Sequence, residues 1–140
     1  MPDNTQRLHQ FMDLVWNTGA VSLVPTFVAE QYTVHSDPGD PWEGQTLSRE
    51  GFAERMQISR APFPDLRFEV TDTVADGDRV AISWIMRGTH LAAMGAVPAT
   101  GRAIAVQGMT IYTFADGYLT GHRQVVDRLA VAAQLGLMGR

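Results

Sequence analysis

Residues 103–126 read AIAVQGMTIYTFADGYLTGHRQVV, two runs of alternating apolar and polar side chains separated by Asp116-Gly117. Alternation with a period of two is typical of β-strands, because successive side chains point to opposite faces of a sheet. An Asp-Gly pair between two such runs favours a tight hairpin. The stretch therefore predicts antiparallel strands over 103–114 and 118–126, at the centre of an antiparallel sheet.

A second hairpin is expected earlier in the chain, with its turn at Asp76-Gly77. Residues 79–91 place these side chains on one face: Val80, Ile82, Trp84, Met86 and His90. The strand before the turn carries in a single phase Leu66, Phe68, Val70 and Val74. The four strands together predict a long antiparallel meander.

Segments with apolar residues at helical spacing precede and follow this meander in the sequence. The remaining expected elements are helices over 5–17, 20–28, 48–59 and 128–136, a short strand over 32–35, and a loop over 36–44 (SDPGDPWEG). Ser48 and Asp127 stand where N-caps are favoured, and Pro25 fits a first turn or a kink.

Helices gathered on one face of an antiparallel sheet define the α+β class. At 140 residues the chain fits a single domain, residues 1–140. Residues 79–91 are apolar in both phases, so we expect both sheet faces to be covered. Helices would cover a concave face and enclose an apolar pocket, and a second subunit would cover the other face.

Composition excludes several classes of function. Hydrophobic residues make up 45% and charged residues 19%, an ordinary globular balance. A net charge of -4 without a Lys/Arg cluster argues against nucleic acid as a partner. The absence of cysteine excludes disulfides and thiol catalysis. No stretch has the apolar length of a signal peptide or a membrane span, so we expect a cytoplasmic protein without a membrane partner.

Candidate acid/base side chains on the central strands are few. No carboxylate lies between Asp78 and Asp116 or between Asp116 and Asp127. Asp127 stands where a strand gives way to a helix, and we interpret it as an N-cap rather than a catalytic acid. Histidine remains as the candidate general base near neutral pH, at three positions on or beside strands: His35, His90 and His122.

The sequence contains no motif for a metal or a cofactor. Histidine pairs at ligand spacing, GxGxxG, the phosphate loop and the GxSxG elbow are all absent, so we expect no metal, flavin or nucleotide. Aromatic residues on several elements instead suit a pocket for a flat, apolar molecule. The expected wall includes Tyr32, Trp42 and Trp84.

Short motifs follow one another along nearly the whole chain. Residues 15–35 (VWNTGAVSLVPTFVAEQYTVH) contain the elements W-N-x-G and Y-x-x-H. Gly88-Thr89-His90, Gly95 and PATGR at 98–102 are followed by D-G at 116–117, H-R at 122–123, Asp127 and Q-L-G at 134–136. In this order and spacing they resemble the SnoaL-like polyketide cyclases, a branch of the NTF2-like superfamily.

The resemblance implies an NTF2-like α+β cone, cofactor-free chemistry on a small hydrophobic molecule, and a homodimer or homotetramer. Family members close the last ring of anthracycline precursors by intramolecular aldol condensation. In them an aspartate after the H-R pair acts as acid/base, assisted by a histidine on the preceding strand. These positions hold Gln124 and Thr110 here. Alternation places His122 beside Gln124 and Tyr112 beside Thr110 on the pocket face.

Three functions remain open at this point. The first is a polyketide cyclase-like enzyme for an aromatic or polycyclic substrate, with His122, His35 or His90 as base and Gln124, Thr110 and Tyr112 as polar anchors. The second is a cofactor-independent hydroxylase of anthracycline pathways, since relatives with that activity also lack the cyclase acid/base pair. The third is a protein that binds an apolar ligand without turning it over.

Overall fold

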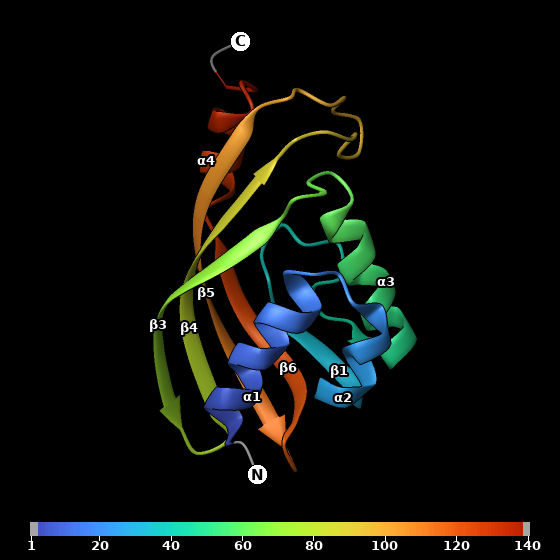
Figure 1. Cartoon of the computed structure of the whole chain (residues 1–140), viewed down its shortest axis with the longest axis vertical. Helices are drawn as coiled ribbons and strands as arrows, with labels where there is room; N and C mark the ends of the chain where they lie inside the picture. The colour runs from blue at the N-terminus through green and yellow to red at the C-terminus, as the bar shows by residue number, and fades with distance from the viewer. Residues whose placement is uncertain (1–2, 139–140) are drawn as a thin grey trace.

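The computed structural model describes residues 3–138, in which helices lie against one side of a strongly curved sheet (Figure 1). The helical elements are α1 (Asn4–Phe11), a π-helical turn (Met12–Trp16), a 3-10 turn (Val21–Leu23), α2 (Val24–Phe27), α3 (Arg49–Arg60) and α4 (Arg128–Gln134). The strands are β1 (Val28–Ser36), β2 (Thr46–Leu47), β3 (Arg67–Asp76), β4 (Arg79–Thr89), β5 (Ala103–Ala115) and β6 (Tyr118–Val126). The expected α+β cone is confirmed.

The helix starts follow the capping signals in the sequence. The Asp3 side chain accepts a hydrogen bond from the Gln6 backbone amide, and the Gln6 side-chain oxygen accepts one from the Asp3 backbone amide, which forms a capping box. The Ser48 side chain accepts a hydrogen bond from the Gly51 amide at 3.0 Å and is the N-cap of α3. Pro25 lies in the first turn of α2, where the missing amide costs no helical hydrogen bond.

The strand order in the sheet is β2-β1-β6-β5-β4-β3. The β3–β4, β4–β5 and β5–β6 pairs are antiparallel, as predicted, but β1 runs parallel to β6, so the sheet is mixed. The strand expected over 32–35 also begins earlier, at Val28, because the preceding helix ends at Phe27. This parallel pairing brings the end of β1 beside His122, since Val34 and His122 are register partners.

Both predicted hairpins are present. Asp116 and Gly117 have φ angles of 52° and 82°, as a type I′ turn requires at its two central residues. In the other hairpin Asp76 pairs with Arg79, so the loop is Gly77-Asp78, one residue later than expected. Gly77, with φ of 60°, takes the first loop position, which requires the left-handed conformation in a type II′ turn.

A β-bulge in β3 overturns one expected orientation. The register with β4 shifts between Val70 and Asp72, which inserts an extra residue into β3. Side chains beyond a bulge change faces, so Val74 is 70% exposed instead of sharing the buried face of Phe68. Asp72 is also exposed.

The core lies between the concave face of the sheet and helices α1 to α3. Its centre is aromatic, with ring centroids of Tyr32 and Phe52 4.8 Å apart and those of Phe11 and Phe52 5.9 Å apart. A smaller cluster below α4 contains Leu135 and Ile104. Among the described helices, none is long and apolar enough to cross a bilayer.

Candidate active site

A cavity of about 540 Å³ lies between the concave face of the sheet, α3 and the loop over 37–45. Its wall is largely apolar and includes the aromatic side chains of Trp16, Phe52, Phe63 and Phe68. Most of the residues expected in the pocket also line it: Tyr32, Trp42, Trp84, Tyr112, His122 and Gln124. Such a wall suits a flat, apolar molecule.

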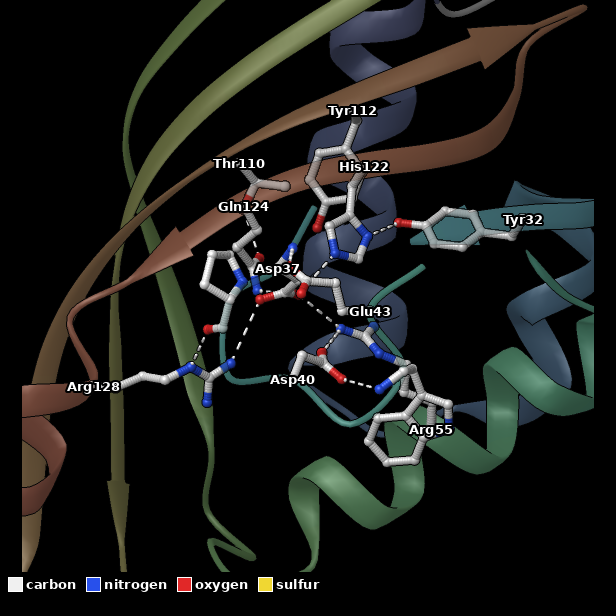
Figure 2. A network of polar contacts seen from close by, with 12 residues as sticks. Tyr32, Asp37, Asp40, Glu43, Arg55, Thr110, Tyr112, His122, Gln124 and Arg128 are labelled. Carbon is white, nitrogen blue, oxygen red and sulfur yellow. Dashed lines mark hydrogen bonds and ion pairs between the residues drawn. The ribbon is translucent and has the colours of Figure 1, made fainter. Parts of the chain in front are cut away.

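Asp37 is the central polar residue of the site, and the sequence analysis missed it. It follows β1, and its side chain is fully buried. Figure 2 shows His122, Gln124, Arg55 and Arg128 gathered around its carboxylate. Oδ2 accepts hydrogen bonds from His122 Nε2 at 2.9 Å, Gln124 Nε2 at 3.1 Å and Arg55 at 3.3 Å. Arg128 contacts the other oxygen at 3.5 Å.

The loop that carries Asp37 is held in place by its own contacts. The Asp37 amide donates to Glu43 at 2.7 Å, and Arg128 Nε donates to the Pro38 carbonyl at 2.8 Å. Gly39 lies beside Arg128 with φ of 90°, and a Cβ there would lie 2.5 Å from Arg128 Nε. A side chain at position 39 would therefore collide with Arg128 and displace it from Asp37.

The imidazole of His122 is buried and bonded at both nitrogens. Nε2 contacts Asp37, and Nδ1 lies 2.5 Å from the hydroxyl of Tyr32. Burial lowers the pKa of His122, against the opposing effect of the hydrogen bond to Asp37, so the ring is neutral at pH 7. Burial also raises the pKa of Tyr32 well above its usual value, which keeps the phenol protonated.

A second acid, Asp40, pairs with Arg55 at the same end of the cavity. The two side chains are 2.5 Å apart, and Arg55 stacks on Trp42 with its guanidinium carbon 5.8 Å from the ring centroid. Burial alone would raise the pKa of Asp40, but the charge and hydrogen bond of Arg55 lower it. Burial alone would likewise lower the pKa of Arg55, yet the charge of Asp40 raises it. Both groups therefore stay ionised.

Thr110 does not line the cavity, although it was expected to contact substrate. Its hydroxyl donates to Gln124 Oε1 at 2.7 Å and accepts from the indole of Trp84 at 2.9 Å. The amide oxygen of Gln124 is thereby engaged, and its NH₂ group is directed to Asp37. Thr110 thus orients the Gln124 side chain without lining the cavity itself.

His35 and His90, the other two candidate bases, do not line the cavity. His35 is exposed on β1, in the phase opposite to Tyr32 and Val34. His90 is buried, but its Nδ1 contacts Thr100 at 3.0 Å and its ring packs on Phe63. Asp127 caps α4 by accepting from the Ala130 amide at 3.0 Å, as expected. Of the candidate bases, only His122 reaches the site.

Within residues 3–138, no group of three or more His, Asp or Glu side chains lies where it could hold a metal ion. The acids of the site are instead neutralised by arginine.

Comparison with known proteins identifies the family to which this fold belongs. The family model for SnoaL-like polyketide cyclases matches residues 6–135. The chain belongs to the SnoaL-like polyketide cyclase family. Among curated proteins, none matches the chain significantly.

Three solved structures show the similarity. A candidate polyketide cyclase from Acidithiobacillus ferrooxidans is 40% identical, with a TM-score of 0.91 over 97% of this chain and 96% of that one. IdmH, a candidate polyketide cyclase from Streptomyces antibioticus, is 28% identical, with a TM-score of 0.83 over 96% and 99%. AclR, a candidate hydroxylase from Streptomyces galilaeus, shares the fold at 24% identity, with a TM-score of 0.79 over 99% and 89%.

Proposed function

We propose that this protein is a cofactor-independent acid/base enzyme that removes a proton next to a carbonyl group of an aromatic or polycyclic polyketide. The contact between His122 Nε2 and the buried carboxylate of Asp37 at 2.9 Å carries this proposal. A neutral imidazole oriented by a carboxylate is a recurring arrangement for a general base at neutral pH.

Asp37 has the supporting role in this pair. It is fully buried, and its carboxylate is occupied by four donors, so a substrate has no free access to it. Its negative charge stabilises the imidazolium that forms when His122 takes a proton, as the acid of a catalytic triad does. Gln124 stands where cyclases have their acid/base aspartate, and an amide cannot take that proton. The base is therefore His122.

The wall of the cavity indicates the kind of substrate. Apolar side chains, several of them aromatic, form most of it, and polar groups gather at the end near Asp37. Arg55 lines this end, and its buried Nε has no hydrogen-bond partner within residues 3–138. A substrate enolate or phenol oxygen would supply the missing acceptor, and a positive donor favours the developing negative charge.

Deuterium exchange tests the proposal without requiring the natural product. An aromatic polyketide ketone is incubated with the protein in D₂O, and its mass is followed. The wild type is expected to incorporate deuterium next to the carbonyl, and His122→Ala should slow this by roughly two or more orders of magnitude. His9→Ala, which removes an exposed histidine on α1, is the matched control. Equal rates in the two variants would contradict the proposal.

A second candidate, a cofactor-independent hydroxylase, is favoured by Gln124, since hydroxylase relatives also lack the cyclase aspartate. An incubation in ordinary water and air, with a reductant added, separates the possibilities by product mass, because hydroxylation by O₂ takes up two electrons and releases the second oxygen atom as water. Ring closure by aldol addition leaves the mass unchanged, whereas hydroxylation adds one oxygen. Tight binding with neither exchange nor product would identify a ligand-binding protein.

We also propose that the convex face of the sheet is covered by a second copy of the chain. Met109, Ile111 and Val125 lie on this face and are 63%, 41% and 67% exposed. Apolar side chains from two adjacent strands form a surface of the kind found at interfaces between subunits. Sedimentation at several concentrations should give a dimer or tetramer, and Met109→Lys should shift it toward monomer.

A further inference from the structure

The hydrogen-bond partners of Asp37 determine which nitrogen of His122 carries the proton. Arg55 and Arg128 can only donate, so the Asp37 oxygens act as acceptors in these contacts. An accepting carboxylate 2.9 Å from Nε2 requires a proton on Nε2. In a neutral imidazole the other nitrogen, Nδ1, then has the free electron pair.

Tyr32 occupies the basic nitrogen. Its hydroxyl lies 2.5 Å from Nδ1 of His122, and because Nδ1 can only accept, the hydroxyl is the donor. Tyr32 lines the cavity, and its hydroxyl oxygen makes no other hydrogen bond within residues 3–138. Because this hydrogen bond occupies the electron pair of Nδ1, a substrate proton can reach that nitrogen through the phenol oxygen.

We propose that Tyr32 is a catalytic residue, the relay through which His122 exchanges protons with the substrate in the proposed reaction. The inference rests on the proposed function and deepens it. It follows from the order of contacts seen in Figure 2, Asp37 to Nε2 and Nδ1 to Tyr32, and from the place of Tyr32 in the wall of the cavity.

The step balances in protons and electrons. The electron pair of the substrate C–H bond stays on the substrate as an enolate, and the proton forms a new O–H bond at Tyr32. The former hydroxyl proton of Tyr32 moves to Nδ1 of His122, which becomes an imidazolium beside Asp37. The reverse transfer returns one proton to the product. Because burial disfavours a free phenolate, the two proton movements take place together.

Tyr32→Phe tests the relay, since it keeps the ring and removes only the hydroxyl. Exchange of the substrate proton in D₂O should fall roughly 100-fold or more. Binding of the ketone, followed by quenching of tryptophan fluorescence, should change less than about threefold, because the aromatic wall remains. A lost rate with retained binding distinguishes a relay from a residue that only shapes the pocket.

Two other tyrosines provide the comparison. Tyr112 is also buried in the wall, but its hydroxyl donates to Met12 Sδ, at 3.8 Å, rather than to a histidine, so Tyr112→Phe should cost less than about tenfold. Tyr118 lies on the surface at the start of β6, and Tyr118→Phe should match the wild type. If Tyr32→Phe exchanges as fast as Tyr112→Phe, the relay is refuted while His122 keeps its role.

Nitrogen NMR of His122 supplies a readout that needs no substrate. The wild type should show the Nε2–H form, and Tyr32→Phe should move the Nδ1 resonance because its hydrogen bond is lost. A proton found on Nδ1 would overturn the relay whatever the kinetics. A wild type that exchanges no faster than His122→Ala would instead refute the proposed function, and the relay with it.

Discussion

Replacing Asp37 by Asn changes the charge of the site with little change of shape. The amide oxygen can occupy the place of Oδ2, which accepts from His122, Gln124 and Arg55. The amide nitrogen would then face Arg128, a half-exposed side chain at 3.5 Å. Most hydrogen bonds can therefore survive, and the main loss is the negative charge.

The expected loss of stability follows from the arginines that remain. Removing one partner of a buried ion pair costs roughly 3–5 kcal/mol. Arg55 keeps Asp40 at 2.5 Å, and Arg128 can turn toward solvent, so we expect the lower end, about 3 kcal/mol. For a chain of this size that corresponds to a fall in Tm of roughly 10 °C.

Asp37→Asn should also slow deuterium exchange, by more than its loss of stability alone would explain. Without the carboxylate, the imidazolium formed at His122 has no negative charge at hydrogen-bond distance, so proton exchange should slow by roughly 100-fold or more. Urea unfolding followed by tryptophan fluorescence and deuterium incorporation followed by mass spectrometry measure the two effects on the same samples.

Asp127→Asn is the matched control for this experiment. It makes the same chemical change at a helix cap outside the site, and Asn caps a helix nearly as well as Asp. We expect a loss of at most about 1 kcal/mol and an unchanged rate. If Asp37→Asn resembles Asp127→Asn in both measurements, Asp37 is not the centre of the site.

Three further predictions concern neighbouring groups. The pKa of His122 is lower in the folded protein than the value of about 6.5 expected in an unfolded chain. Its contribution to stability is therefore present above pH 6.5 and is lost as the pH falls through the folded pKa. His122→Gln should flatten this part of the dependence of unfolding free energy on pH, measured by urea unfolding. Thr110→Val should release the Gln124 amide and leave the Trp84 indole unpaired, costing roughly 1–3 kcal/mol in unfolding free energy. Gln124→Asp should place a second carboxylate beside Asp37 and restore the acid/base of the cyclases, and an aldol substrate should then give a ring-closed product visible by chromatography.

Local patterns predict much of this fold because they depend on neighbouring residues. The hairpin at Asp116-Gly117, the cap at Ser48 and the alternation that puts His122 and Gln124 on one face of β6 require no knowledge of the rest of the chain. The family resemblance, not the alternation, predicted that this face lines the pocket. The bulge in β3 is different, because the extra residue is set by pairing with β4. The pattern alone therefore left Val74 on the wrong face.

Asp37 was missed because its place at the centre of the site is set by residues far from it in the sequence. It lies in a Pro- and Gly-rich loop 85 positions before His122, and only the parallel pairing of β1 with β6 brings the two together. Two acids flanking Pro-Gly at the end of a strand are a weak signal for such a site. Arginines on two different helices, Arg55 and Arg128, complete it, and no local pattern connects them.

The pH dependence of kcat/KM for deuterium exchange tests most directly whether His122 is the base. This profile reports the essential groups of the free enzyme. Because burial lowers the pKa of His122, the rate should rise through an apparent pKa below 6.5 and be level at neutral pH, and the rise should disappear in His122→Ala. A profile that is unchanged in His122→Ala, or that rises only above pH 8, would contradict the account.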